Sequence, residues 1–403
     1  MLSSQPVTSK HLGASRLSAV GFWPTMLAAP LALYSIAYPA LRQIDALGVI
    51  AVFTLGAISV AMTKRVDLAR SYIWFFAFSV GVLAISLAGE MPTAWTRYHD
   101  NFAALRQWSW VIIFPVAVSA FSELLRSWSG LLRRNGLTVL IACIIVSRAS
   151  RLLFADVTVT NGIFLYTLSN DVAIIYCLFA VWLFLDRRAP SWVKVLSLAL
   201  ALAVSSSAQS QIVVALLCVI YLVRMPRLTF WVYVSALSAF LAVAPYFALE
   251  LHRMDPNTGI RSSLWRDTIT AVEQTFGVGV GYGTEYITNN FIELKGRSWT
   301  VISESAAGRL FIGTHSGIYD VLLRLGVVGL LLFAIWLLQE LAVAGRSRNL
   351  ATAQTTAGIG IVLMTAIFVN VGMASMGFVF GVSFCVAALR HFARDGEYLG
   401  PRR

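Results

Sequence analysis

A histidine follows Thr314 in the segment Thr314-His-Ser-Gly-Ile-Tyr-Asp320, which leads directly into a long apolar run. Imidazole titrates near neutral pH, so His315 has the chemistry of a general base. Thr314 or Ser316 is expected to cap the helix that follows. A histidine at a helix start is also commonly a capping or surface residue. The residue types alone therefore leave a catalytic and a structural interpretation open.

Two arginines precede this histidine in the segment Arg261-Ser-Ser-Leu-Trp-Arg-Asp-Thr-Ile-Thr-Ala-Val-Glu-Gln274. Its periodicity predicts a helix over 261–274, with Trp265 on the apolar face and Arg266 and Asp267 on the polar face. Arg261 would stand near the helix N-terminus, where a guanidinium beside free backbone N–H groups suits a phosphate. A solvated connector is the alternative interpretation.

Further candidates are weaker. Arg148 and Arg151 are three residues apart on one expected helix face, where they either extend to lipid headgroups or hold an anion inside the protein. The run Gly277-Val-Gly-Val-Gly-Tyr-Gly283 has no strand–helix context, so we interpret it as a tight turn rather than a nucleotide site. No cluster of acidic, histidine or cysteine ligands is apparent, and we predict no metal and no cofactor.

The elements that position these residues are expected to be membrane helices. Hydrophobic residues make up 58% of the 403-residue chain and charged residues only 12%, whereas soluble chains are roughly a quarter charged. The net charge of +12 is spread between apolar runs rather than along one stripe, so we predict no nucleic-acid partner. The composition therefore predicts an all-α polytopic membrane protein.

Apolar runs of about 20 residues predict a bundle of about twelve transmembrane helices. The expected spans are 22–41, 44–62, 72–89, 107–125, 136–154, 168–185, 192–208, 211–223, 229–249, 318–343, 354–371 and 376–389. A polar patch at 205–211 makes the seventh and eighth either two spans or one re-entrant pair. The predicted organisation is a tail at 1–21, spans one to nine at 22–249, a loop at 250–317, spans ten to twelve at 318–389 and a tail at 390–403.

Lysine and arginine alternate between the connecting segments in a way that predicts orientation. If both termini are cytoplasmic, every inside segment carries at least two basic residues, and most outside loops carry one or none. The long loop 250–317 then lies outside, with Trp265 at headgroup level on the outer surface. Its arginines cannot be explained by anionic cytoplasmic lipid.

The order RSSLWRD, GVGVGYG and THSGIYDVLLRLGVVGLLLF resembles the superfamily of O-antigen ligases and O-antigen and exopolysaccharide polymerases. These membrane glycosyltransferases combine an Arg-x-x-x-Trp helix, a glycine-rich turn and a histidine segment leading into a glycine-containing span. Asn170, in Leu168-Ser-Asn-Asp171, resembles the family's asparagine at that place. The chain departs from the family at 205–211, where an expected arginine is missing.

The resemblance implies a GT-C-like bundle in the bacterial inner membrane with its active face in the periplasm. It implies an undecaprenyl-diphosphate-linked oligosaccharide donor, the lipid bilayer and other polysaccharide assembly proteins as partners. His315 would act as the base. For this reaction we assign the donor diphosphate to Arg261, Arg266, Arg148, Arg151 and Arg324, and positioning of the acceptor or loop to Trp265, Gly281, Tyr319 and Asn170.

Several functions remain open at this stage. A polymerase that joins repeat units is favoured over a ligase that transfers glycan to lipid A core. A secondary transporter is the alternative from another class, because Asn170, Asp171 and the patch at 205–211 would suit a broken-helix site. A scaffold for polysaccharide assembly would need no histidine and arginine constellation.

Overall fold

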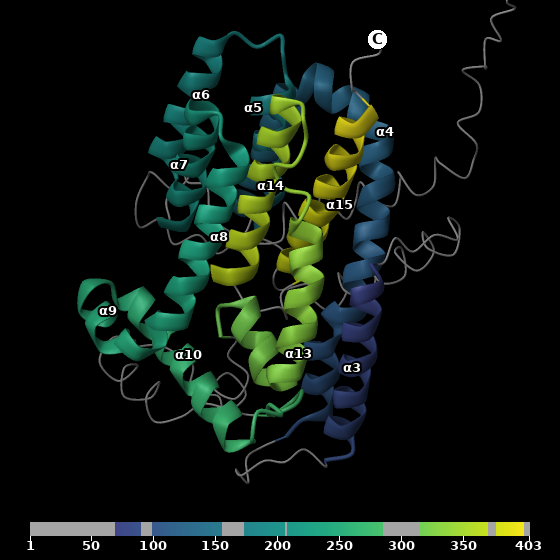
Figure 1. Cartoon of the computed structure of the whole chain (residues 1–403), viewed down its shortest axis with the longest axis vertical. Helices are drawn as coiled ribbons and strands as arrows, with labels where there is room; N and C mark the ends of the chain where they lie inside the picture. The colour runs from purple at the N-terminus through teal and green to yellow at the C-terminus, as the bar shows by residue number, and fades with distance from the viewer. Residues whose placement is uncertain are drawn as a thin grey trace, which may run out of the picture.

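The computed structural model describes residues 69–89, 99–154, 173–205, 208–284, 314–369 and 376–398, and this part of the chain is helical without a named strand (Figure 1). One isolated antiparallel bridge joins His99 to Thr284. The helices are α3 (Arg70–Leu87), α4 (Asn101–Phe154), α5 (Ala173–Leu185), α6 (Ser191–Val204), α7 (Ala208–Val223), α8 (Pro226–Val243), η3 (Ala244–Phe247), α9 (Ala248–Met254), α10 (Pro256–Gln274), α13 (Gly317–Leu341), α14 (Leu350–Val369) and α15 (Met376–Tyr398).

The predicted helical membrane class is confirmed. Within the described residues, five helical stretches are long and apolar enough to cross a membrane, and four shorter apolar helices accompany them. The five are Arg70–Leu87, Asn101–Leu132, Pro226–Met254, Gly317–Leu341 and Leu350–Phe368. The first two expected spans, 22–41 and 44–62, lie outside the described residues, so the total of twelve stays a prediction.

The connecting segments are sorted between the two ends of the bundle (Figure 1). The upper end holds the end of α5, the start of α6, the end of α7, the start of α8 and the end of α15. The turn after α13 joins them, because Gly345 lies against Arg227 at the start of α8. At the lower end lie α9, α10 and the start of α13.

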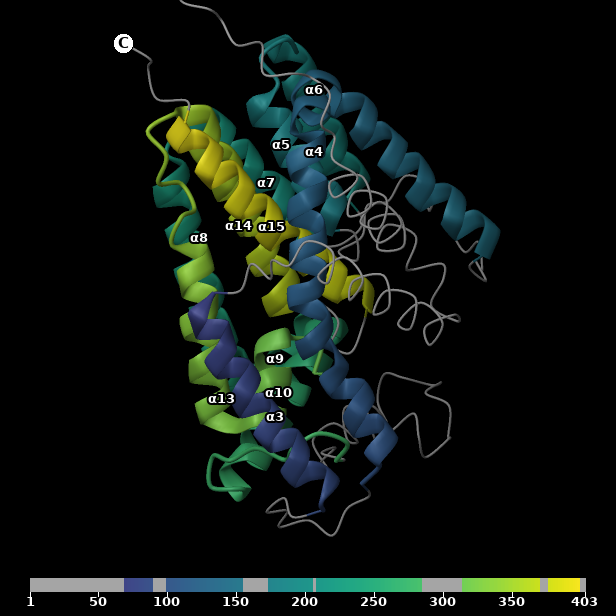
Figure 2. The ribbon, with the colours of Figure 1, turned by 90° about the vertical axis from the view of Figure 1, so that its right-hand side faces the viewer.

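Helix α4 contains a sharp bend at Asn135, whose φ of −128° and ψ of 30° are not helical. Figure 2 shows the chain turning back on itself at this point. The expected spans 107–125 and 136–154 are the two arms of this bent helix. Gly136 follows the bend and packs against Trp182 of α5, which fixes the second arm.

Helices α6 and α7 form a short hairpin around Ser205. They contain 14 and 16 residues, which is a length of roughly 21–24 Å at 1.5 Å per residue. The hydrocarbon core of a bilayer is about 30 Å thick. Ser205 has an extended backbone, and its carbonyl accepts a hydrogen bond from Gln211 Nε2 at 3.2 Å. These lengths favour the re-entrant pair over two full spans.

Aromatic side chains fill the space between α3, α4 and α13. Burying apolar surface drives association weakly inside lipid, so van der Waals packing and hydrogen bonds hold the helices together. Tyr72 of α3 packs against Phe114 of α4 and Trp336 of α13, with ring centroids 5.5 and 5.4 Å apart. Its hydroxyl donates to the Val111 carbonyl at 2.7 Å. This core fixes the C-terminal half of α13 against α3 and α4.

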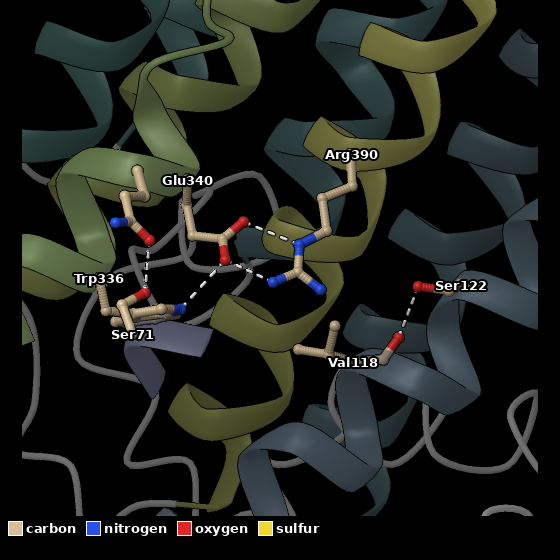
Figure 3. Close-up of polar contacts among 7 residues, drawn as sticks. Ser71, Val118, Ser122, Trp336, Glu340 and Arg390 are labelled. Atoms are coloured by element: carbon tan, nitrogen blue, oxygen red, sulfur yellow. Dashed lines mark hydrogen bonds and ion pairs between the residues drawn. The ribbon is translucent and has the colours of Figure 1, made fainter. Parts of the chain in front are cut away.

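A buried ion pair joins α13 to α15 at the level of Trp336 (Figure 3). Arg390 Nε donates to Glu340 Oε2 at 2.8 Å, and Arg390 Nη2 also contacts the carboxylate. Trp336 Nε1 donates to Glu340 Oε1 at 3.0 Å. Because both charged side chains are largely buried, the pair and its added hydrogen bond fix how the two helices pack.

Candidate functional site

Helix α13 is broken at Gly326, which has a φ of +65° and a ψ of −164°. A break leaves backbone groups without their helical partners. Two of them bond to residues 276–284, which we name the glycine turn. Val280 N–H donates to the Leu323 carbonyl at 2.8 Å, and Val327 N–H donates to the Gly277 carbonyl at 2.9 Å. The glycine turn therefore completes the hydrogen bonding of the broken helix.

This contact requires glycine on both sides. A Cβ at Gly326 would lie 2.2 Å from the Gly277 carbonyl oxygen, and one at Gly279 would lie 2.6 Å from the Gly326 nitrogen. Both glycines also have positive φ, which other L-residues adopt only at a cost. The predicted tight turn, with close approach of another backbone, is confirmed, and the element approached is the break in α13.

The glycine turn is also anchored by side chains. Arg324 is buried and donates from Nη1 to the Gly281 and Thr284 carbonyls at 3.1 and 2.6 Å. Tyr282 shares a 2.7 Å hydrogen bond with Ser79 of α3. Burial raises the pKa of Tyr282 above its ordinary value, while Ser79 and the positive charge of Arg324 act in the opposite direction. The Tyr282 phenol therefore stays protonated in the physiological range.

His315 lies in a left-handed backbone conformation, with a φ of +55°. This region costs a non-glycine residue energy, and residues held in it concentrate at functional sites. Neighbouring bonds hold the turn: Thr314 N–H and its hydroxyl donate to Asp320 Oδ1 at 2.9 and 2.7 Å. The Asp320 N–H donates to the Ser316 carbonyl at 2.9 Å. His315 is therefore fixed in a strained position at the start of α13.

Helices α8 and α10 converge on this turn through aromatic contacts. Trp265 stacks on Tyr319 with ring centroids 5.2 Å apart and an interplanar angle of 3°. Trp265 Nε1 donates to the Thr314 carbonyl at 2.9 Å, and the Tyr319 hydroxyl donates to the Leu241 carbonyl at 2.7 Å. We call Trp265, Thr314, His315, Ser316, Tyr319 and Asp320 the His315 cluster. Three segments distant in sequence thus hold the turn that carries His315.

The structure corrects the predicted setting of α10. The helix begins at Pro256 rather than near Arg261, and Asp255 Oδ2 accepts the Thr258 N–H at 3.1 Å. Arg261 therefore lies in the second turn and not beside free N–H groups. It is half-buried and four residues before Trp265, so both lie on one face of α10.

Burial also contradicts the predicted faces of α10. Trp265 is 1% exposed, so it packs inside the protein and does not lie at headgroup level. Asp267, predicted on the solvated face, is completely buried. Both differences have one cause: α10 packs against η3 and the start of α13 instead of lying alone on the surface.

The other predicted site residues are distributed as follows. Arg266 is exposed and lies about 100° around α10 from Trp265. Arg324 contacts carbonyl oxygens of the glycine turn, and Gly281 belongs to that turn. The backbone at Arg148 and Arg151 is in the second arm of α4, but their side chains lie outside the described part of the structure, as does all of Asn170. The structure therefore brings together His315, Trp265 and Tyr319, and separately Arg324 and Gly281.

The sequence does not identify three buried hydroxyls near these elements. The Oγ atoms of Ser262, Ser263 and Ser316 find no hydrogen-bond partner within the described residues, and each serine is at most 1% exposed. Ser316 begins α13 without a side-chain capping bond, contrary to expectation. Buried hydroxyls without partners are costly, so they mark places where a hydroxylated or charged ligand would gain hydrogen bonds. Only the Ser-Ser pair beside Arg261 hints at them in the sequence.

The described residues contain no group of three or more histidine, cysteine, aspartate or glutamate side chains able to hold a metal ion. What they offer is a histidine on a backbone turn held by hydrogen bonds, buried hydroxyls and guanidinium groups. Such groups suit proton transfer and binding of an anionic substrate. Neither protein-family models nor curated protein sequences give a match to this chain.

Proposed function

We propose that the chain is a membrane glycosyltransferase that polymerises polysaccharide at the periplasmic face of the bacterial inner membrane. It uses glycan linked to undecaprenyl diphosphate as donor, in a bundle of about twelve spans with both termini in the cytoplasm. The observation that carries this proposal is the His315 cluster. Motif residues from 265 to 320 converge there on one histidine in a strained backbone conformation.

The proposed reaction places a proton acceptor and a cation on opposite sides of one bond. The acceptor hydroxyl oxygen attacks the anomeric carbon of the donor sugar while the His315 imidazole takes the hydroxyl proton. The bond from the anomeric carbon to the diphosphate oxygen breaks, and undecaprenyl diphosphate leaves with the electron pair. Arg261, on the α10 face that carries Trp265, balances the charge that develops on this leaving group.

The location of these groups favours transfer over transport. A transporter binds its substrate near the middle of the membrane, at discontinuous helices. The His315 cluster instead lies where α8 ends and α13 begins, at the lower end of the bundle (Figure 1). In the proposed orientation this end faces the periplasm, which supplies the sugar acceptor from water while a polyprenyl chain stays in lipid.

A purified assay tests this function. The full chain in detergent is given undecaprenyl-diphosphate-linked repeat units without ATP or added metal, because the donor is already activated. Lengthening of the lipid-linked glycan on gels supports a polymerase. Transfer only when lipid A core is supplied would replace polymerase by ligase. Unchanged substrate in both mixtures, with protein that unfolds cooperatively, would reject glycosyl transfer.

A further inference from the structure

A cavity at the upper end of the bundle lies far from the His315 cluster. Its volume is about 590 Å³, and it lies between the start of α8 and the turn that joins α13 to α14. Helices α8 and α14 begin candidate membrane spans there, at Pro226 and Leu350. The cavity is therefore at the level where apolar helices meet the interface, next to lipid headgroups.

The cavity combines cationic and apolar walls. Arg227 and Arg348 line it together with Ser347 and Trp231. Both arginines are exposed, and no carboxylate among the described residues pairs with either. Two cations that line one cavity without a counter-ion favour an anionic ligand.

Backbone groups add to this positive potential. Helix α8 begins after Met225, whose side chain makes no capping hydrogen bond, and Pro226 occupies the first turn. The N–H groups of Arg227 and Leu228 precede the first intrahelical bond and lie at the positive end of the helix dipole. Both residues line the cavity. The arginine side chains and this helix start therefore act on the same space.

The cavity is held open by packing that does not depend on a ligand. Gly345 has a φ of +71°, and a Cβ there would lie 2.8 Å from Arg227 Cα. Its N–H donates to Thr356 Oγ1 at 3.0 Å, which ties the turn to α14. This close approach places Ser347 and Arg348 beside the start of α8. The backbone therefore forms this cavity in the absence of a ligand.

Apolar side chains at the rim favour a lipid over a free anion as the ligand. Met225, Leu228 and Leu350 line the cavity and are 56%, 60% and 42% exposed. A free phosphate would gain nothing from these side chains, whereas the acyl chains of a phospholipid would cover them. We propose that this cavity binds the headgroup of an acidic phospholipid, with its phosphodiester between Arg227 and Arg348 and its acyl chains along α8.

Native mass spectrometry of the full chain tests the proposal. The protein is released from detergent in the presence of equal amounts of phosphatidylglycerol and phosphatidylcholine with the same acyl chains. The wild-type chain should retain phosphatidylglycerol in preference. Charge near a headgroup adds about fivefold in affinity for each arginine. Arg227→Gln with Arg348→Gln should therefore remove most of this preference.

The matched control is Arg187→Gln with Arg188→Gln, which removes two exposed charges from the same end outside the cavity. It should retain the lipid like the wild type, and equal melting temperatures would show that both double variants fold. Equal loss in the two double variants would reduce the effect to general surface charge and overturn the site. Displacement of the lipid by millimolar inorganic phosphate would also overturn it, in favour of a free-anion site.

Discussion

At the scale of single residues, His315 shares a left-handed backbone with Arg224 and Phe276, and the proposal gives its imidazole a catalytic role. A surface residue at a helix start gains nothing from a φ of +55°, whereas glycine would adopt it without cost. The bonds from Thr314 to Asp320 keep the histidine there. Retention of an unfavourable conformation is expected where the imidazole must point at a substrate.

His315→Gly and His315→Asn make this argument testable, because both residues tolerate the left-handed region and neither can act as the base. Turnover in the purified assay should fall by about 10²–10⁴-fold in both. The melting temperature should stay the same or rise slightly for the glycine variant. Wild-type turnover in the two folded variants would leave His315 a structural residue only.

Arg261 is expected to act through the geometry of its guanidinium. Arg261→Ala should lose most product, and Arg261→Lys should not restore it fully, because an ammonium cannot bind a diphosphate through two parallel bonds. Arg253→Ala is the matched control, since Arg253 is an exposed arginine on the neighbouring α9. Equal activity of Arg261→Ala and Arg253→Ala would remove Arg261 from the proposed site.

At the scale of elements, the end of α13 that carries His315 is separated from the rest of the helix by the break at Gly326. The glycine turn bonds on both sides of this break, so its position and that of α13 depend on each other. The other end of the helix is held by the ion pair between Glu340 and Arg390. The His315 cluster is thus carried by a helix that is fixed at both ends.

Gly326→Ala should destabilise the protein by about 2–4 kcal/mol, through the added contact with the Gly277 carbonyl and the positive φ. Thermal unfolding in detergent measures this effect. Gly81→Ala is the control: Gly81 lies inside α3 with open space around it, and alanine there should stabilise the helix by up to about 1 kcal/mol. A Gly326→Ala protein as stable as Gly81→Ala would contradict the backbone contact.

The ion pair is tested by a double-mutant cycle. Glu340→Gln or Arg390→Gln alone leaves a buried charge without its partner and should cost about 3–5 kcal/mol. The double variant should cost clearly less than the two single variants together. Additive losses in thermal unfolding would show that the two side chains do not interact.

At the scale of the whole molecule, the two ends of the bundle have different chemistry. The upper end gathers the basic connecting segments and the cavity beside Arg227, and the lower end gathers α10, the glycine turn and the His315 cluster. The proposed substrate site and the proposed lipid site therefore lie at opposite ends of the bundle. It also makes orientation the most direct test of the whole arrangement.

A reporter enzyme that works only outside the cytoplasm should be active when fused near Asn289 and inactive near Arg188 or Arg346. The expectation rests on the alternation of lysine and arginine between segments. Protein levels of the three fusions serve as controls. Activity of the fusion at Arg188 would reverse the orientation and with it the proposed periplasmic site.

The sequence by itself determined the helical membrane class and most helix positions, because apolar runs and basic segments depend only on local composition. It also indicated the tight turn at Gly277–Gly283. The tertiary structure decided that Trp265 and Asp267 are buried, since periodicity cannot tell whether a neighbouring element covers a helix face. It also decided the left-handed conformation of His315 and the break at Gly326, because the partners that stabilise them come from other segments. Long-range packing, which no local pattern encodes, assembled the candidate site.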